Sequence, residues 1–129
     1  MAVRAFAPSD LEEVHRLLAS SGWAHRIPDA QYLARLIAAS QRVVVAEIDG
    51  RIVGFARAIT DGISNGYLSM VVVAPDVRRQ GLGRALAEQI MQGDDAITWV
   101  LRAGREGADA FFASLGFVDS AVAMERRRR

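Results

Sequence analysis

Arginines and glycines are concentrated in one short segment, Arg78-Arg79-Gln80-Gly81-Leu82-Gly83-Arg84. A valine-rich run ends at Pro75 before this segment, and an apolar pattern typical of a helix follows it. The first turn of a helix has unpaired backbone N–H groups and a partial positive charge. Glycines let an anion approach that backbone closely, and the arginines add mobile positive charge. The segment therefore predicts a site for a phosphate or pyrophosphate.

Two widespread phosphate-binding motifs do not fit this segment. A dinucleotide fingerprint requires a third glycine three residues after Gly83, where Leu86 stands. A P-loop requires a lysine followed by serine or threonine, and the chain contains no lysine. The Gly-x-Gly spacing on its own also fits a plain strand-to-helix turn with surface arginines.

The composition narrows the classes of function. The chain has 129 residues, which suits a single domain over residues 1–129. It has no cysteine and only two histidines, so we expect no disulfide, no cysteine nucleophile and no metal site. A formal net charge of +1 argues against a nucleic-acid partner. Without a signal-peptide core or an apolar run near the roughly 20 residues that cross a bilayer, we expect a cytoplasmic protein with no membrane partner.

The hydrophobic pattern predicts the elements that position the segment. Strands are predicted at residues 3–6, 42–48, 52–59, 67–73, 97–101 and 117–125. Helices are predicted after a capping box at Ser9 and Glu12, after an N-cap at Asp29, from the Gly81–Gly83 region to Ile90, and around residues 108–115. The Asp49-Gly50 pair predicts a tight hairpin, and strand–helix–strand order predicts that the fifth strand runs parallel to the fourth.

Three motifs in this order resemble the GNAT N-acetyltransferase superfamily. Arg78 to Gly83 matches the family pattern Arg/Gln-x-x-Gly-x-Gly/Ala and follows a Val-Val-Val-x-Pro strand end. A strand at residues 97–101 comes next, and Phe111 to Phe117 is similar to the family's Phe-Tyr-x-x-x-Gly-Phe helix end. The resemblance covers the chain from the first helix onward. It implies an α/β (α+β) fold with a mixed, mostly antiparallel central sheet of six to seven strands and helices on both faces.

The same resemblance implies acetyl-CoA as co-substrate. Backbone groups of Val71 and Val73 would pair with the pantetheine arm as an added strand. N–H groups of Arg79 to Arg84 would hold the pyrophosphate, and an N–H near Val71 or Val72 would stabilise the oxyanion. In the family, the fourth and fifth strands separate near a bulge and open a slot for the thioester. The implied cofactor-binding residues are Val71, Val72, Val73, Arg78, Arg79, Gln80, Gly81, Leu82, Gly83, Arg84, Arg105 and Phe112.

The proton-transfer groups depart from the family pattern. The family's tyrosine general acid corresponds to Phe112, and its asparagine corresponds to Arg105, which could contact a phosphate instead. A thiolate with a pKa near roughly 8.5 is a tolerable leaving group, so a missing acid slows the reaction without forbidding it. The catalytic candidates are Val72 for the oxyanion, Ser114 or Tyr67 as substitute acids, and Asp61 or Glu47 as bases, with Ser69 and Met70 where relatives can carry a carboxylate.

The main hypothesis is transfer of an acetyl group from acetyl-CoA to a primary amine by direct attack on the thioester. A non-catalytic acyl-CoA-binding or sensing module is the alternative, which Phe112 and the lack of a carboxylate on the strand at 67–73 favour. A structural domain that binds no nucleotide is a third. The acceptor can be a small-molecule or peptide amine, and Trp23, His25 and Tyr32 resemble the family's acceptor-side wall. A homodimer is the commonest form of soluble oligomer.

Overall fold

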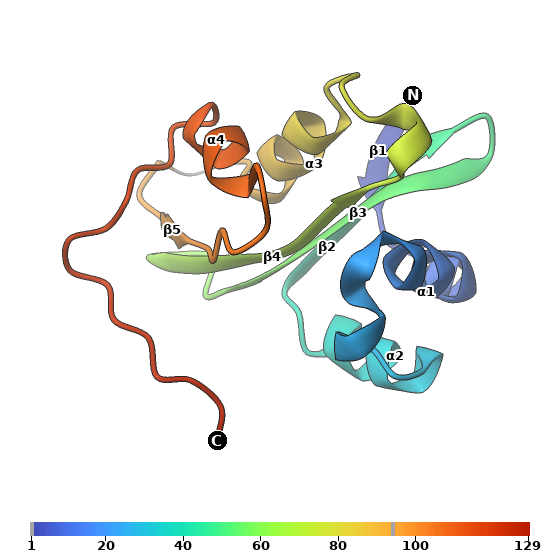
Figure 1. The fold of residues 1–129 in the computed structure, drawn as a ribbon, viewed down its shortest axis with the longest axis horizontal. Helices are drawn as coiled ribbons and strands as arrows, with labels where there is room; N and C mark the ends of the chain where they lie inside the picture. Colours follow the sequence, from blue (N-terminus) through green and yellow to red (C-terminus); the bar gives the residue numbers. More distant parts are fainter. Residues whose placement is uncertain (1, 94) are drawn as a thin grey trace.

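A mixed sheet with helices on both faces forms the protein in a computed structural model, which describes residues 2–93 and 95–129 (Figure 1). The strands lie in the order β1-β2-β3-β4-β5. All neighbouring strands are antiparallel except β4 and β5, which are parallel as predicted. Their bounds are Ala2–Ala5 (β1), Arg42–Ile48 (β2), Arg51–Thr60 (β3), Asn65–Val73 (β4) and Thr98–Val100 (β5).

The helices cover the two faces of the sheet in pairs. In Figure 1, α1 and α2 lie on one side, and α3 and α4 lie on the other. Their bounds are Leu11–Leu18 (α1), Ala30–Ala38 (α2), Leu82–Ile90 (α3) and Ala108–Ala113 (α4). Because β3 is covered on both faces, its burial is almost continuous rather than alternating. Among the described residues, none of the helices has the length and apolar character that a bilayer crossing requires.

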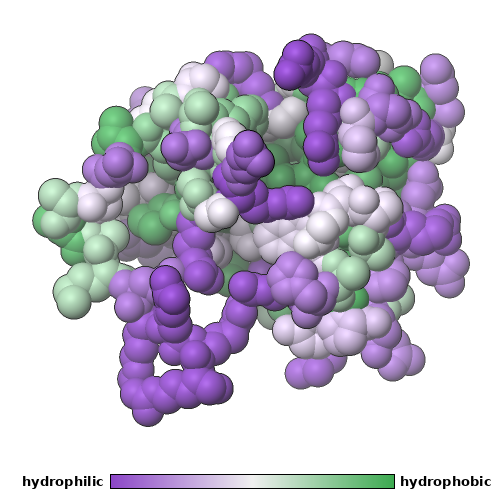
Figure 2. All heavy atoms as spheres, in the orientation of Figure 1, coloured by the Kyte–Doolittle hydropathy of each residue, from purple (hydrophilic) through white to green (hydrophobic). Residues whose placement is uncertain are grey.

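The predicted sixth strand is wrong, so the sheet of the described residues has five strands instead of six to seven. Residues 117–125 form no strand and lead into a tail that leaves α4 and runs away from the sheet (Figure 1). Val118, Val122 and Met124 are between 88% and 98% exposed there. An extended segment is stable only when a partner strand pairs with it, and the neighbouring β5 is three residues long. Figure 2 shows a strongly hydrophilic projection where this tail ends.

The start of the first helix also differs from the prediction. The capping box uses Asp10, whose Oδ2 accepts the N–H of Ala7 at 2.8 Å, and not Ser9 with Glu12. Arg4 holds the same carboxylate with two hydrogen bonds of 2.8 and 3.0 Å. The reason is that proline at position 8 starts a 3₁₀ turn two residues earlier than an N-cap at Ser9 would allow.

Two predicted turns are confirmed. Asp29 caps α2, where its Oδ1 accepts the N–H of Tyr32 at 2.8 Å. Asp49 and Gly50 join β2 to β3 with φ angles of 50° and 76°. Two successive left-handed residues are the requirement of a tight hairpin turn whose twist matches the strands. These turns place α2 against one face of the sheet and bring β3 into its centre.

The strand β4 contains a bulge, and β5 separates from it. The register between β3 and β4 shifts between the pairs Phe55–Val72 and Arg57–Ser69. Met70 lies in this bulge with a φ of 55°, a left-handed conformation that is uncommon outside glycine. The pairs that join β4 to β5 end at Tyr67–Val100. The two strands therefore separate beyond Tyr67. The family resemblance implies a slot at such a separation.

Candidate functional site

A pocket of about 500 Å³ lies where β4 and β5 separate. Three segments form it: the end of β4, the loop that enters α3, and the loop that enters α4. The structure brings together every residue predicted to bind the cofactor except Gln80, whose side chain is exposed. The lining residues are Val71, Val72, Val73, Arg78, Arg79, Gly81, Leu82, Gly83, Arg84, Arg105, Glu106, Gly107, Ala108, Phe111 and Phe112.

The open edge of β4 offers backbone groups to this pocket. Ala74 donates its N–H to Val53 of β3 at 2.8 Å. Because backbone polar groups alternate between the two edges of a strand, those of Val73 and Val71 point away from β3. The carbonyl of Val73 accepts Nε of Arg78 at 3.1 Å on that side. The end of β4 can therefore accept an extended ligand as an added strand.

The loop before α3 provides an anion-binding backbone. Gly81 is the N-cap of α3, and no side chain of the described residues caps this helix. Arg79 and Gly81 have φ angles of 67° and 81°, so left-handed residues alternate with ordinary ones. Such an alternation turns successive N–H groups toward one concave side. A Cβ at Gly81 would contact nothing within 4 Å, so the space beside this backbone is open.

Three arginines surround the same loop. Arg78 is held by the carbonyl of Val73, and Arg84 donates from Nη2 to the carbonyl of Ser114 at 3.1 Å. Arg79 lines the pocket with its neighbours. Guanidinium groups bind phosphate oxygens strongly, because charged hydrogen bonds add to the geometric match. The positive charge and the open N–H groups of α3 together suit a pyrophosphate.

Gly83 has a packing role that sequence analysis did not find. A Cβ at this position would lie 3.0 Å from Cζ of Phe111 and 3.3 Å from its Cε1. Phe111 in turn packs edge-to-face with Phe112, and Phe112 with Phe117, at centroid distances of 4.9 and 5.7 Å. The absence of a side chain at Gly83 therefore lets α4 approach the first turn of α3 and form the pocket wall.

Asp61 is engaged in its own loop. Its Oδ1 accepts N–H groups of Ile63, Ser64 and Asn65 at 2.8, 2.8 and 3.1 Å, and its Oδ2 accepts the Ser64 hydroxyl at 2.6 Å. The hydroxyl of Ser64 and these N–H groups hold the pKa of the Asp61 carboxyl far below its ordinary value. Five residues of β4, or about 16 Å, separate Asn65 from the bulge at Met70. Asp61 is thus a weak proton acceptor far from the slot.

The remaining catalytic candidates lie at different places. Val72 lines the pocket, as an oxyanion-binding position requires. Ser69 is half-buried and pairs with Arg57 just before the bulge. The Ser114 hydroxyl is exposed and donates to the carbonyl of Phe111, which closes the last turn of α4. Of these candidates, the structure brings only Val72 to the pocket wall.

Arg105 connects the pocket with the segment between α1 and α2. Its Nη2 donates to the carbonyl of Ser21 at 2.7 Å, and its guanidinium lies 5.5 Å from the ring centroid of Trp23. Gly22 has a φ of 90°, a left-handed conformation that favours glycine, and a Cβ there would come within 2.6 Å of Nη2 of Arg105. Arg105 lines the pocket and also donates to protein groups, so its contact with a phosphate stays a prediction.

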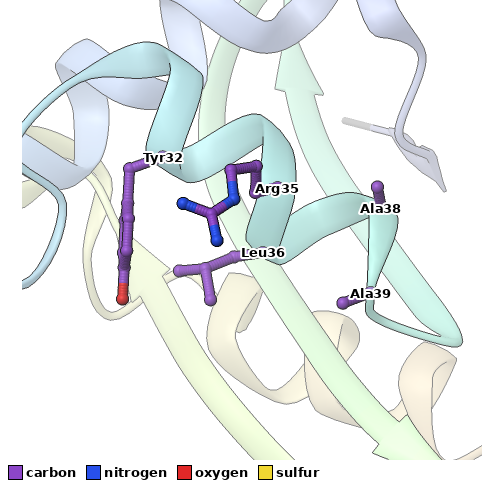
Figure 3. A pocket seen from close by; sticks show the side chains of 5 residues that line it. All are labelled: Tyr32, Arg35, Leu36, Ala38 and Ala39. Atoms are coloured by element: carbon purple, nitrogen blue, oxygen red, sulfur yellow. The ribbon is translucent and has the colours of Figure 1, made fainter.

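A second pocket, of about 570 Å³, lies on α2. Figure 3 shows Tyr32, Arg35 and Leu36 pointing from the same side of this helix. Below α2, the sheet carries Arg57, which is 9% exposed and whose Nε has no hydrogen-bond partner among the described residues. Sequence analysis missed Arg57, although a charged residue inside the apolar run Val53–Ala58 was a signal.

The model of the GNAT acetyltransferase domain matches residues 39–119, which is more than half of the chain. The chain belongs to the GNAT acetyltransferase family. This GNAT chain is 26% identical over 116 residues to an uncharacterized N-acetyltransferase, ycf52, of Pyropia yezoensis. That alignment spans 84% of the chain and only 65% of the length of the relative.

Solved structures have the same fold. A GNAT-family acetyltransferase from Xanthomonas campestris pv. campestris is 28% identical, with a TM-score of 0.79 over 99% of this chain and 94% of that one. An aminoglycoside N-acetyltransferase, AAC(6')-Iy, in complex with CoA is 21% identical, with a TM-score of 0.75 over 99% and 94% of the two chains. At that identity the second likeness concerns the fold alone. Within the GNAT fold, the described residues contain no group of three or more His, Cys, Asp or Glu side chains placed to hold a metal ion.

Proposed function

We propose that this GNAT-family protein transfers an acetyl group from acetyl-CoA to a primary amine. The observation that carries the proposal is the pocket between the end of β4 and the starts of α3 and α4, which joins an open strand edge to an uncapped helix start. The complex of AAC(6')-Iy with CoA supports the choice of co-substrate.

The residues of the pocket fit acetyl-CoA in both its parts. The pantetheine arm has amide groups that can pair with Val71 and Val73 on the open edge of β4. The pyrophosphate carries negative charge that suits the loop from Arg78 to Gly81 and the first turn of α3. The arm and the pyrophosphate are held mainly by backbone groups, so side-chain variation elsewhere leaves this binding mode intact.

The chemistry is a direct displacement at the thioester carbon. As the amine nitrogen forms its bond to that carbon, the carbonyl oxygen gains negative charge, which an N–H near Val71 or Val72 stabilises. The C–S bond then breaks, CoA leaves as a thiolate, and the nitrogen loses its extra proton to solvent. Phe112 supplies no proton to the sulfur. CoA can still leave without this proton, because a thiolate whose conjugate acid has a pKa of roughly 8.5 is a weak base and therefore a tolerable leaving group.

A binding experiment tests the co-substrate. We expect acetyl-CoA at about 100 times its Kd to stabilise the folded protein by about 2.7 kcal/mol, seen as a rise in melting temperature. Arg79→Glu, which reverses a charge at the pocket, should weaken binding at least about tenfold by repulsion of the pyrophosphate. Arg126→Glu in the exposed tail is the matched control and should leave binding unchanged. No stabilisation at saturating acetyl-CoA would refute the proposal.

A second experiment separates an enzyme from a sensing module. A non-catalytic acyl-CoA-binding module is the other candidate, which Phe112 in the pocket and the absence of a carboxylate in β4 favour. Release of free CoA thiol is measured with a panel of amines at saturating acetyl-CoA. Amine-dependent release supports the transferase, whereas tight binding without release with every amine supports the module.

A further inference from the structure

Arg57 is a buried cation on the side of the sheet that α2 covers. It lies on β3, is 9% exposed, and donates from Nη1 to the hydroxyl of Ser40 at 3.0 Å. The Ser40 hydroxyl donates in turn to the carbonyl of Leu36 at 2.6 Å. This relay orients one nitrogen of the guanidinium. Its Nε, which is fully buried, has no hydrogen-bond partner among the described residues.

No carboxylate balances this charge in the described part of the chain. The ion pairs there involve Arg4, Arg51, Arg102 and Arg127, and not Arg57. Burial lowers the pKa of Arg57, and Tyr67 and Tyr32 are the neighbours that oppose this effect. Buried charges in proteins are normally paired, because an unpaired one loses its hydration without compensation. A guanidinium left in this condition is suited to an anion that arrives with a ligand.

Arg57 lies between neighbours of the pocket on α2 and the strand that carries the slot of the proposed transferase. Tyr32 and Leu36 line the α2 pocket (Figure 3). Arg57 interacts with Tyr32 and is linked to the carbonyl of Leu36 through the Ser40 hydroxyl. In register, Arg57 faces Ser69, two residues before Val71. Two residues along a strand and one strand spacing amount to about 8 Å between the backbones of Arg57 and Val71. A small molecule can therefore reach from Arg57 to the thioester.

We propose that Arg57 binds a carboxylate of the acceptor, so that the substrates are amines that also carry a carboxylate, such as amino acids. This inference rests on the proposed function for its acceptor amine. A carboxylate is favoured over a phosphate because its single charge balances the single buried guanidinium, whereas a phosphate dianion leaves uncompensated charge. The planar guanidinium also matches the two oxygens of a carboxylate.

Equilibrium binding tests this proposal without turnover. Calorimetry measures the binding of β-alanine, of its amide, and of 2-aminoethylphosphonate, together with α- and γ-amino acids and their amides. Each titration uses the full chain alone and again with saturating CoA. We expect amino acids to bind at least tenfold more tightly than their amides. Arg57→Met should abolish this preference, and Arg57→Lys should reduce it at least threefold, since lysine lacks the bidentate geometry.

Arg42→Met is the matched control. Arg42 also belongs to the sheet, and it donates to the carbonyl of Ile90 at the end of α3, on the other face. It should keep the full carboxylate preference. Removal of an unpaired buried cation should leave the melting temperature of Arg57→Met equal or higher. If that variant does not fold, Arg57→Lys still decides, because an unchanged preference would overturn the proposal.

The outcomes distinguish this inference from the proposed function. Equal binding of amino acids and amides, or tighter binding of the phosphonate, overturns the carboxylate site even if amines are acetylated. Failure of every carboxylate to bind, with and without CoA, overturns it as well. Preference for carboxylates that depends on Arg57, without any acetyl transfer, supports the site and refutes the transferase.

Discussion

Phe112 occupies the position where the family resemblance places a tyrosine general acid. The ring lines the pocket and packs between Phe111 and Phe117. It provides wall surface without a proton donor. If the protein is the transferase that we propose, the departing thiolate leaves without help from this helix, and the rate of the chemical step depends on how well the backbone stabilises the oxyanion.

Phe112→Tyr should raise kcat for acetyl transfer by about tenfold or more, because a positioned general acid contributes roughly 10²–10⁴ to such steps. Turnover is measured by thiol release at saturating acetyl-CoA and amine. Phe117→Tyr is the control, since Phe117 belongs to the same aromatic cluster and does not line the pocket. It should change kcat less than about twofold. An unchanged rate in Phe112→Tyr means that sulfur protonation does not limit the reaction.

Single residues differ in how much of their role could be predicted. The left-handed Gly81 lies where the Gly-x-Gly spacing suggested a bare backbone, because the need for φ above zero selects glycine locally. The contact of Gly83 with Phe111 joins residues far apart in sequence and could not be predicted from spacing. Asp61 is a candidate base because it is a carboxylate near a strand end. In the structure its carboxylate accepts four hydrogen bonds within its own loop, and these hold the loop in shape.

At the scale of elements, the bulge in β4 decides where the slot opens. Met70 is 7% exposed and adopts a φ of 55° in the middle of a strand. A left-handed residue that is not glycine is strained, and it persists only where its surroundings hold it. Here the buried side chain of Met70 anchors the bulge, and the bulge turns the end of β4 away from β5.

Met70→Ile should destabilise the protein by about 2–3 kcal/mol, because a β-branched side chain is strongly disfavoured at positive φ. The free energy of unfolding is measured by chemical denaturation. Leu68→Ile is the matched control on the same strand, where the buried side chain has an ordinary backbone conformation. Leucine and isoleucine have the same volume, so Leu68→Ile should lower the free energy of unfolding by less than about 1.5 kcal/mol. Equal costs in the two variants would show that the bulge carries no strain.

At the scale of the whole molecule, Arg105 joins two segments 84 positions apart in the sequence. One segment enters α4 and lines the pocket, and the other is the connection between α1 and α2. The hydrogen bond to Ser21 and the contact with Trp23 hold that connection. It contains two further buried polar atoms, Ser21 Oγ and Trp23 Nε1, that find no hydrogen-bond partner in the described part of the chain. Arg105 thus links the pocket wall on one face of the sheet to the connection between α1 and α2 on the other face.

Arg105→Ala should increase amide hydrogen exchange in residues 19–26 by roughly tenfold, which corresponds to the loss of about 1.4 kcal/mol of local stability. Hydrogen-exchange mass spectrometry measures it. The control is Arg102→Ala, which removes an exposed ion pair with Glu125 at 2.7 Å from the same loop. That variant should leave exchange in residues 19–26 unchanged. Unchanged exchange in Arg105→Ala would show that Arg105 does not stabilise the connection between α1 and α2.

The pair of Arg4 and Asp10 ties β1 to the start of α1 and makes the stability of the whole chain depend on pH. Hydrogen bonds from Arg4 are the main cause that lowers the pKa of the Asp10 carboxyl below its ordinary value of 3.8, and the Ala7 N–H adds to it. A lowered pKa in the folded state means that the stabilisation is complete above the unfolded value. It is lost as the pH falls below 3.8 through the folded value.

Asp10→Asn should lower the free energy of unfolding by about 2 kcal/mol at pH 7, since hydrogen bonds to charged groups contribute roughly 1.5–3 kcal/mol. It should also flatten the decline in stability below pH 4. Denaturation at several pH values measures both effects. The control is Asp76→Asn, whose partner Arg51 and own side chain are more than half exposed. Solvent screens that pair, so its effect on the acid decline should be smaller. A larger effect from Asp76 would contradict this account.

The sequence by itself determined the position of the loop before α3, most element positions and the parallel β5, because these depend on local backbone rules and on periodic burial. It also indicated the family through three short motifs, each of which is local in the sequence. The tertiary structure decided that residues 117–125 remain outside the sheet, since a strand exists only when a partner pairs with it. The tertiary structure also decided that Gly83 packs against Phe111, and that Arg105 binds the carbonyl of Ser21. It buried Arg57 without an ion pair among the described residues. Each of these depends on residues distant in sequence, whose meeting no local pattern encodes.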